Sequence, residues 1–516
     1  MDITQGAPPS PPDAQARFEA LQERLVPLWH SIEHLNADEQ TIVVVPSISV
    51  DLVDTGHVPM QPYEERLLFM LLLLRQPRAR LVYVTSLPIL PSIVDYYLDL
   101  LPGVIPSQAR PRLFTVPVLD GTARPLTAKL LERPRLLQRI RDLIPDKHRA
   151  HLVPFNTTTL ERDLAVRLGI PMYGADPRHF AFGTKTGGRQ LFADEGVSHP
   201  LGAEGLTSLD EVVDAVIAMR QEKPGITQVL VKLNEGVSGD GNALVDLAAV
   251  ADSEGRAATR AAIEAMRFEA EHMTLDVFLT RFAEWGGIVE ERIQGRDFAS
   301  PSVQMRITPP GDLVVLSTHD QLLGGQDGQS YLGCVFPADP EYAPMITREA
   351  EKVGLRLARE GVIGRFALDF VVVRNAAGEW EAHAIEVNLR KGGTTHPFLT
   401  LQFLTDGRYD ASTGLFLTRV GQEKHLVATD HLESDSFRGL SVDDLFDIVA
   451  RHGLHFDQAR QTGVVFHMIS CLTEEGRVGL TAVGDTPAQA DATYRKAERI
   501  LLQEGQAAFN EAVQLP

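Results

Sequence analysis

Two apolar runs joined by a short polar turn constrain the fold of this chain more than any other feature. Residues 366–370 and 384–391 each have the composition of a β-strand, although acidic side chains interrupt both. Between them, residues 375–378 read Asn-Ala-Ala-Gly, which is a suitable hairpin connection. The pattern predicts an antiparallel hairpin in which polar side chains project from an otherwise buried sheet.

Polar side chains are expected on one face of this hairpin. Glu386, Asn388 and Arg390 are spaced two apart, so they point to the same side of their strand. Asp369 on the partner strand can face them. Two carboxylates and an amide oxygen make an oxygen-only site that suits Mg²⁺ holding a nucleotide phosphate. Arg390 could neutralise a transferring phosphoryl group.

The alternative for this face is an ordinary solvated sheet surface. The residues around Asp369 and Glu386 are strongly apolar, and unpaired charges among them would be costly. The sequence therefore favours a site over a solvated face.

A second segment, residues 229–242, joins a strand to a glycine-rich loop. The strand carries Lys232, and Gly236, Gly239 and Gly241 follow. Glycines let backbone N–H groups approach phosphate oxygens closely, and a lysine adds a point charge. A mobile surface loop beside a lysine with an extended stem is an equally good interpretation of this segment alone.

Two familiar phosphate-binding motifs are excluded. The loop does not match G-x-G-x-x-G, and no helix clearly starts at it, which argues against a dinucleotide fingerprint. Residues 183–186, Gly-Thr-Lys-Thr, lack the leading glycine and the Gly-Lys-Thr order of a Walker loop.

A third segment, residues 287–297, is an apolar strand that carries Glu290 and Glu291 and ends at a glycine. Such a strand can offer backbone groups to an adenine edge and carboxylates to amino or ribose groups. Because charged pairs at strand ends are common, this segment indicates little by itself.

Composition limits the classes of partner. The formal charge of −20 argues against nonspecific binding to nucleic acid or to an anionic membrane. The start of the chain is polar and does not resemble a signal peptide, and the longest apolar run, residues 67–74, is far too short to span a bilayer. Cys334 and Cys471 have no metal-ligand spacing, and they suit a reducing cytosol. We expect a cytoplasmic protein.

Strand and helix signals alternate through the first third of the chain and predict a doubly wound parallel sheet. The expected strands are residues 41–45, 80–85, 113–116 and 151–154, and the expected helices are residues 18–35, 64–75, 92–101 and 133–143. A capping box at Thr158 and Glu161 opens a further helix that Gly169 ends.

The pattern changes near residue 176, and three domains are expected: residues 1–175, 176–424 and 425–516. Within the second, residues 246–284 read as a long helical region. Residues 406–435 read as a linker, and residues 463–472 and 478–483 as a hairpin before a final helix from about residue 487.

The order of these segments resembles the ATP-grasp superfamily of carboxylate–amine ligases, and most of all its pheganomycin-type peptide ligases. The resemblance covers most of the chain. It also rests on Gly-Thr-Lys at residues 183–185, on residues 318–322 (Thr-His-Asp-Gln-Leu) and on residues 386–397, Glu-Val-Asn-Leu-Arg-Lys-Gly-Gly-Thr-Thr-His-Pro.

The resemblance implies a role for each matching residue. Lys185 and Lys232 would bind the ATP phosphates. The loop would fold over them through Gly236, Ser238, Gly239 and Gly241. Glu290, Glu291 and Ile293 would form the adenine hinge, with Arg292 between them and Asp297 at the ribose. The metal ligands would be Asp369, Glu386 and Asn388, and Arg390 would stabilise phosphoryl and acyl-phosphate oxygens. Lys391 and His396 would contact a substrate carboxylate, and a structural histidine before a proline is an equally good interpretation of His396.

The resemblance further implies an α/β fold with a Rossmann-like pre-grasp domain, a grasp core of two α+β subdomains and a small C-terminal α+β domain. It implies ATP and Mg²⁺ as cofactors, with Mn²⁺ as an alternative, and ligation of a small carboxylate to an amine or peptide through an acyl phosphate. A homodimer is a superfamily-level expectation. Two alternatives stay open: a small-molecule kinase on the same fold, and a nucleotide-binding regulatory protein without turnover.

Overall fold

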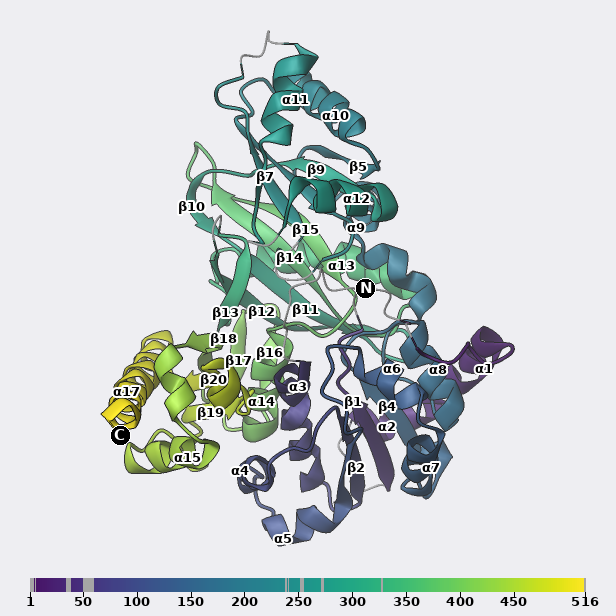
Figure 1. Cartoon of the computed structure of the whole chain (residues 1–516), viewed down its shortest axis with the longest axis vertical. Coiled ribbons are helices and arrows are strands. Elements are labelled where there is room, and N and C mark those ends of the chain that lie inside the picture. Colours follow the sequence, from purple (N-terminus) through teal and green to yellow (C-terminus); the bar gives the residue numbers. More distant parts are fainter. Residues whose placement is uncertain are drawn as a thin grey trace.

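The computed structural model describes residues 4, 6–33, 39–49, 60–236, 239, 241–250, 255–270, 273–325 and 328–514. Helices and strands are both abundant, which confirms the α/β class. Figure 1 shows a parallel sheet with its helices at the bottom, a small sheet with helices at the top, and a large antiparallel sheet between them that extends to the C-terminal helix.

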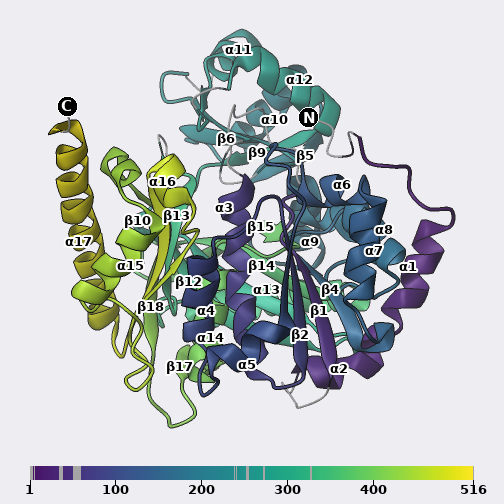
Figure 2. The same ribbon diagram turned by 60° about the horizontal axis from the view of Figure 1, so that its bottom comes forward.

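The parallel sheet forms the N-terminal third, as predicted. Its strands lie in the order β3-β2-β1-β4, and all neighbours pair in parallel. Every side chain of β1 is buried, as expected for a sheet covered on both faces. Figure 2 shows helices on either side of these strands. The strands are β1 (Gln40–Val45), β2 (Ala79–Thr85), β3 (Leu113–Pro117) and β4 (Ala150–Pro154).

The helices around this sheet depart from expectation in two places. The helix predicted over residues 18–35 is two helices, α1 (Ala14–Gln22) and α2 (Leu25–Glu33), because Pro27 has no N–H with which to continue a helix from α1. Residues 64–75 form mainly a 3₁₀ helix, η1 (Glu65–Arg75), after the short α3 (Met60–Glu64). Its side chains from residue 67 to residue 74 are all buried.

The remaining helices of this part agree with the sequence pattern. Helix α8 (Thr159–Leu168) begins at the predicted capping box and ends at Gly169, whose φ is 72°. The others are α4 (Pro91–Asp99), α5 (Pro106–Ala109), η2 (Arg110–Arg112), α6 (Leu126–Leu131), α7 (Pro134–Asp142) and η3 (Lys147–Arg149).

The small subdomain is an antiparallel sheet in the order β5-β9-β6-β7-β8. The long helix predicted over residues 246–284 is wrong: β8 (Arg267–Phe268) interrupts it by pairing with β7 (Asn242–Asp246). Tertiary pairing overrides the helical propensity there. The other elements are β5 (Gly202–Leu206), α10 (Leu209–Glu222), β6 (Gln228–Leu233), α11 (Arg256–Glu264), α12 (Leu275–Trp285) and β9 (Gly287–Glu291).

The large sheet runs in the order β10-β14-β11-β12-β13-β18-β20-β19, with β15 on β14. It contains the predicted hairpin, β14 (Gly364–Arg374) and β15 (Trp380–Asn388). The other strands are β10 (Arg296–Ala299), β11 (Pro301–Ile307), β12 (Leu313–Gly324) and β13 (Ser330–Phe336), and the adjoining helices are η4 (Pro177–Gly183), α9 (Lys185–Asp194), α13 (Ala343–Arg359) and α14 (Thr395–Thr405).

Residues 406–435 are not a linker. They contain a small hairpin, β16 (Arg408–Asp410) and β17 (Leu415–Leu417), and the buried strand β18 (His425–Glu433). Strand β18 pairs with β13 on one side and β20 on the other. The large sheet is therefore continuous across residue 425, where the sequence places a domain boundary.

The C-terminal hairpin and helix are confirmed, except that the first strand ends at residue 467 and residues 471–472, expected to belong to it, begin a short helix. Strand β19 pairs with β20, and α17 follows. One buried cluster unites η1 of the parallel sheet layer, Phe336 of the large sheet, Phe398 of α14 and Leu445 of α15. The elements are η5 (Asp435–Gly439), α15 (Val442–Arg451), β19 (Gly463–His467), α16 (Cys471–Glu475), β20 (Arg477–Gly484) and α17 (Pro487–Gln514). Among the described residues, no helix has the length and apolar character needed to cross a membrane.

Candidate active site

A cavity of about 950 Å³ lies where the three sheets meet. The parallel sheet layer contributes Tyr63, Arg66 and Phe155 to its lining. The small subdomain contributes β6, β9 and part of the glycine loop, and the large sheet contributes β14, β15 and their neighbours. Contacts between Glu269 and Ser330 (2.8 Å) and between Asn242 and Gln329 (2.9 Å) join the small subdomain to the large sheet beside the cavity.

The hairpin β14–β15 brings its polar residues together as the spacing predicts. Asp369 is paired directly with Glu386 across the two strands. The Asn388 side-chain amide donates a hydrogen bond of 3.0 Å to Asp369. All three residues and Arg390 line the cavity. A bulge follows the Asp369 pair, so the strands shift register just beyond the acidic residues.

The electrostatics of this hairpin suit a cation. Burial raises the pKa of Asp369 to about 7, and the charge of Glu386 contributes to the rise, while Ser302 and Arg390 oppose it. Burial also lowers the pKa of Arg390. Two adjacent carboxylates with an amide are the donor set that Mg²⁺ prefers, and a divalent ion would offset their repulsion. The residues therefore fit the metal that the sequence implies.

Lys185 approaches this hairpin from the opposite wall. Its Nζ is 4.0 Å from Glu386 Oε1. Lys185 begins α9, and the Asn234 side chain accepts a hydrogen bond of 3.0 Å from the N–H of Thr186. This bond ties the start of α9 to the end of β6, which carries Lys232. No sequence motif singles out Asn234.

Lys232 is held by a buried ion-pair group. Its Nζ lies 2.5 Å from one oxygen of Glu290, and Arg189 lies 3.4 Å from the other. All three side chains are buried. The Glu290 carboxylate therefore positions Lys232, and a contact between Glu290 and an adenine would come from its backbone. Sequence reasoning missed Arg189, because nothing in α9 marks it as a partner of a distant strand.

The predicted hinge connects the two sheets. Arg292 and Ile293 leave β9 and lead into β10, and both line the cavity. Glu291 is held by Lys223 (2.5 Å) and by the N–H of Leu201 (3.2 Å). Adenine is thus expected against backbone groups at this crossing rather than against the Glu291 carboxylate.

Of the other predicted site residues, some line the cavity and others do not. Gly236, Gly239 and Gly241 line the cavity, whereas Ser238 lies outside the described residues. Asp297 is exposed, pairs with Arg374 at 3.3 Å, and is not part of the lining. The ribose role expected of Asp297 has no support in this placement.

Lys391 and His396 are also absent from the lining. Lys391 is buried and donates to the carbonyl of Pro154, so its ammonium faces the parallel sheet layer. Burial lowers the pKa of Lys391 to about 7. His396 is buried against Asp430 and His467. Neither side chain belongs to the cavity lining, and the substrate contacts expected of them stay a prediction.

A cavity that lies between two sheets and is lined by two lysines and by the acidic hairpin β14–β15 suits an enzyme that binds a phosphorylated ligand between sheets. Biotin carboxylase from Campylobacter jejuni, solved with a β,γ-ATP ligand, superposes with a TM-score of 0.51 at 13% identity, covering 91% of this chain and 96% of that one. This likeness establishes the fold alone.

Sequence comparison is more specific. A family model described as "IQCH-like, ATP-grasp" matches residues 260–412, and one described as "PGM1 C-terminal domain" matches residues 444–497. The L-propargylglycine–L-glutamate ligase of Streptantibioticus cattleyicolor is 32% identical over 455 residues, which are 86% of this chain and 90% of that protein. The chain therefore belongs to the ATP-grasp superfamily of carboxylate–amine ligases.

A more distant relative is the IQ motif-containing protein H of Danio rerio. It is 24% identical over 423 residues, which are 72% of this chain and 39% of that protein. This chain thus spans well under half the length of that relative.

Proposed function

We propose that this protein is an ATP-dependent ligase that joins the carboxylate of an amino acid, or of a modified amino acid, to an amine or peptide. The observation that carries the proposal is the hairpin β14–β15. It sets Asp369, Glu386 and Asn388 against Lys185, within a cavity that also contains Lys232 and Arg390. The ligase relative, which aligns over most of the chain, supports the same reaction class.

The chemistry proceeds in two displacements. A carboxylate oxygen attacks the γ-phosphorus of ATP, the bond from that phosphorus to the bridging oxygen breaks, and ADP leaves. The amine nitrogen then attacks the acyl carbon, loses a proton, and expels inorganic phosphate to leave an amide. Lys185, Lys232 and Arg390 stabilise the negative charge that spreads over the phosphoryl oxygens. No protein nucleophile is required.

Asp369, Glu386 and Asn388 would hold Mg²⁺, which when bound supplies charge neutralisation at the ATP phosphates. Mn²⁺ takes the same octahedral oxygen ligands and is proposed as a substitute. The ion-paired Glu290 keeps Lys232 extended toward the cavity. The enclosing walls limit the access of water to the reactive acyl phosphate.

Hydroxylamine trapping tests the reaction class. The protein is incubated with ATP, Mg²⁺ and each member of an amino-acid panel that includes L-propargylglycine and L-glutamate, with hydroxylamine as the nucleophile. We expect a hydroxamate and an equal amount of ADP for the correct carboxylate. Formation of AMP and pyrophosphate, or ADP formation that yields a phosphorylated product without an amide, would refute the proposal.

Substitution tests the metal site. Asp369→Ala and Glu386→Ala should each lower turnover at least about a thousandfold, because each removes a charged ligand from the metal that neutralises the transferring group. Glu381→Ala is the matched control, since Glu381 lies on β15 but faces solvent. Near-normal turnover in both site variants would contradict the assignment.

A further inference from the structure

A polar group of three side chains, of which one is an arginine, also lines the cavity. Arg66 comes from η1, Tyr63 from α3 and His431 from β18. In Figure 1, α3 lies below β14 and β15, whereas β9 lies above them. The elements that carry the hinge and this group therefore lie on opposite sides of the hairpin β14–β15.

Arg66 is fixed in one orientation. Its guanidinium carbon lies 4.3 Å from the centre of the Tyr63 ring, and its Nη2 is 2.6 Å from Asp430 Oδ2. The Arg66 side chain is 13% exposed, and its Nε has no hydrogen-bond partner among the described residues. Nδ1 of His431 is likewise buried without a partner there. Buried polar atoms without partners call for a ligand or a water.

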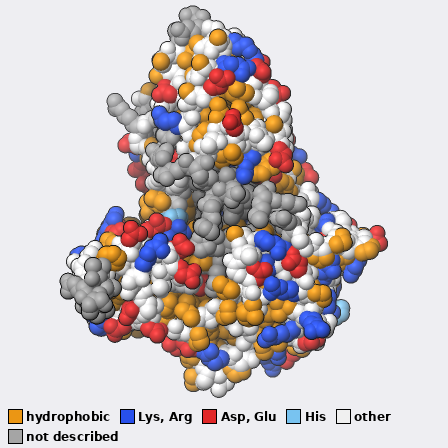
Figure 3. Space-filling view, viewed as in Figure 1, with side chains coloured by type: hydrophobic (Ala, Val, Ile, Leu, Met, Phe, Trp, Pro, Cys, Tyr) orange, Lys and Arg blue, Asp and Glu red, His pale blue; other side chains and the backbone are white. Residues whose placement is uncertain are grey.

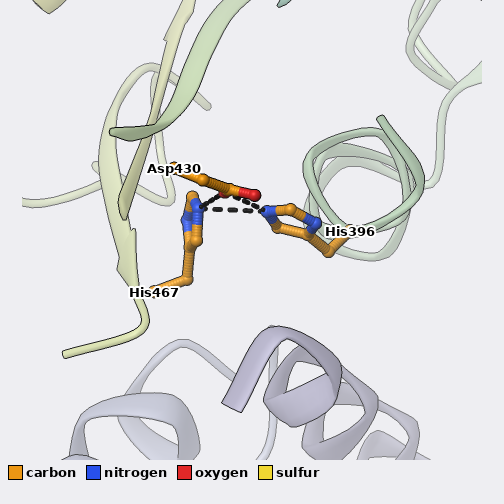
Figure 4. A group of neighbouring side chains, drawn as sticks. All are labelled: His396, Asp430 and His467. Carbon is orange, nitrogen blue, oxygen red and sulfur yellow. Dashed lines mark hydrogen bonds and ion pairs between the residues drawn. The ribbon is translucent and has the colours of Figure 1, made fainter. Parts of the chain in front are cut away.

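Asp430 is itself held by two histidines, His396 and His467 (Figure 4). Its Oδ1 accepts from Nε2 of His396 at 3.0 Å and from Nε2 of His467 at 2.6 Å. An ionised carboxylate can only accept, so both Nε2 atoms carry hydrogen. Their mutual separation of 3.0 Å follows from sharing one acceptor oxygen. The group joins α14, β18 and the end of β19 to a side chain of η1.

The same three atoms could be considered as metal ligands, since they lie within 4.8 Å of one another. The charges argue against this. Asp430 is already balanced by Arg66, whose Nη2 lies 2.6 Å from its Oδ2. A divalent ion would add two positive charges beside the Arg66 guanidinium. Among the described residues Arg66 has no second carboxylate as an ion-pair partner, so nothing would offset the added charge. The cluster of His396, Asp430 and His467 is better explained as a support that holds the Arg66 side chain.

Arg66 and Arg390 also influence each other. Burial lowers the pKa of Arg390, and the charge of Arg66 lowers it further. Both side chains line the cavity, so an anion between them would be stabilised by both. An ammonium group there would be repelled. The carboxylate of the donor substrate reacts with the γ-phosphoryl group beside Arg390. The anion that remains to be bound by Arg66 is therefore one carried by the second substrate, the acceptor.

We propose that Arg66, assisted by His431, binds a carboxylate of the acceptor amine, so that the acceptor is an amino acid or a peptide with a free carboxylate rather than a simple amine. This inference rests on the ligase function proposed above. Asp430, His396 and His467 are positioning residues that hold Arg66. Arg66 belongs to the parallel sheet layer. This layer therefore supplies acceptor specificity, whereas the small subdomain and the large sheet supply the residues that carry out the reaction.

Two assays separate the substrates. Hydroxamate formation needs only the donor carboxylate, ATP and hydroxylamine, whereas amide formation also needs the acceptor. With the donor found by trapping, each L-amino acid is compared as acceptor with its carboxamide. Wild type should use at least one free acid at least about tenfold better than the matching carboxamide, because charge-assisted hydrogen bonds are the stronger ones.

Arg66→Met should raise KM for the acceptor about 10- to 100-fold, abolish the preference for acid over carboxamide, and leave hydroxamate formation within about twofold. Arg66→Lys should restore part of the preference, and Asp430→Asn should resemble Arg66→Met more weakly. Arg75→Met is the control, because Arg75 lies on the same helix and pairs with Asp406 outside the cavity lining.

The outcomes are distinguishable. If wild type yields no hydroxamate with any carboxylate, the ligase function itself fails. If hydroxamate forms but Arg66→Met leaves the acceptor KM and the acid preference unchanged, only this inference fails. An equal loss in both assays assigns Arg66 to the donor instead. Stoichiometric metal in the purified protein that disappears in His467→Asn would overturn the positioning role of the Asp430 group.

Discussion

Glu65 is a buried carboxyl that neither the ligase reaction nor the acceptor site uses. It precedes Arg66 on η1 and is 1% exposed. One oxygen accepts from the N–H of Ser470 at 3.2 Å, and the other has no partner among the described residues. Burial raises the pKa of Glu65 from 4.5 to about 7, although the Ser470 hydrogen bonds oppose the rise.

This raised pKa predicts a pH-dependent stability. Because the folded-state pKa lies above the unfolded value, the favourable contribution is complete below pH 4.5 and is lost as the pH rises through about 7. Glu65→Gln should therefore gain stability relative to wild type as the pH rises, by about 2 kcal/mol in unfolding free energy between pH 5.5 and pH 8.

Thermal melts of both proteins at the two pH values measure this difference. Glu379→Gln, on the exposed turn between β14 and β15, is the control and should show no such dependence. A Glu65→Gln protein that gains no stability relative to wild type between the two pH values would contradict the prediction.

At the residue scale, the sequence predicted the residues whose neighbours are local. Asp369, Glu386 and Asn388 share one hairpin, so strand periodicity was enough to place them together. Arg66 and Asp430 are 364 positions apart and meet only because η1 packs beside β18. No local pattern marks such a pair, and for the same reason Arg189 and Asn234 could not be identified.

At the scale of elements, hairpins and capped helices were predictable because their signals lie within a few residues. Strand β18 was missed because it has no hairpin partner next to it in sequence: it pairs with β13 and β20, which are both distant. The break at β8 was missed for a similar reason, since β7 pairs with it across an intervening helix.

Gly333 tests how much the β13–β18 pairing matters. A Cβ at this position would lie 2.2 Å from the carbonyl oxygen of Ala428, directly on β18. Gly333→Ala must therefore push the two strands apart, and we expect a loss of about 1–3 kcal/mol in stability. Hydrogen exchange should show faster exchange of the β18 amides in the variant.

Gly255→Ala is the matched control, because a Cβ there meets nothing within 4 Å. It should melt within about 1 °C of wild type. If Gly333→Ala melts like the control, the pairing between β13 and β18 does not contribute to stability as the geometry requires.

At the scale of the whole molecule, the buried clusters do not follow the three domains expected from the sequence. One cluster joins the parallel sheet layer to the C-terminal strands and helices through Phe336 and Phe398. The small subdomain has a separate core around Val216, Phe278 and Val289. Composition changes along the chain locate linkers, but they carry no information about which distant segments share a core.

This division predicts two unfolding units. The small subdomain, residues 201–291, should exchange its amide hydrogens as one unit and at lower cost, because its core is isolated. The strands β2 and β20 should exchange together, because they contribute to one cluster. Phe398→Ala should therefore accelerate exchange in β2 and β20 alike while leaving β6 and β9 unchanged, as measured by hydrogen–deuterium exchange with mass spectrometry.

Phe278→Ala is the reciprocal control and should affect β6 and β9 alone. Independent exchange of β2 and β20 in the Phe398→Ala protein would show that the shared cluster does not couple the two ends of the chain.

The shared core has a consequence for engineering by recombination. Arg66 projects from η1, whose apolar side chains pack into the same cluster as the C-terminal strands. A chimera that takes its N-terminal third from another ligase would gain a new residue at the acceptor contact. It would also gain apolar side chains on η1 that do not match the C-terminal strands against which they pack. Substrate exchange in this protein should therefore succeed through a few substitutions around Arg66 and His431, or through joint transfer of both chain ends, rather than through a single crossover near residue 175.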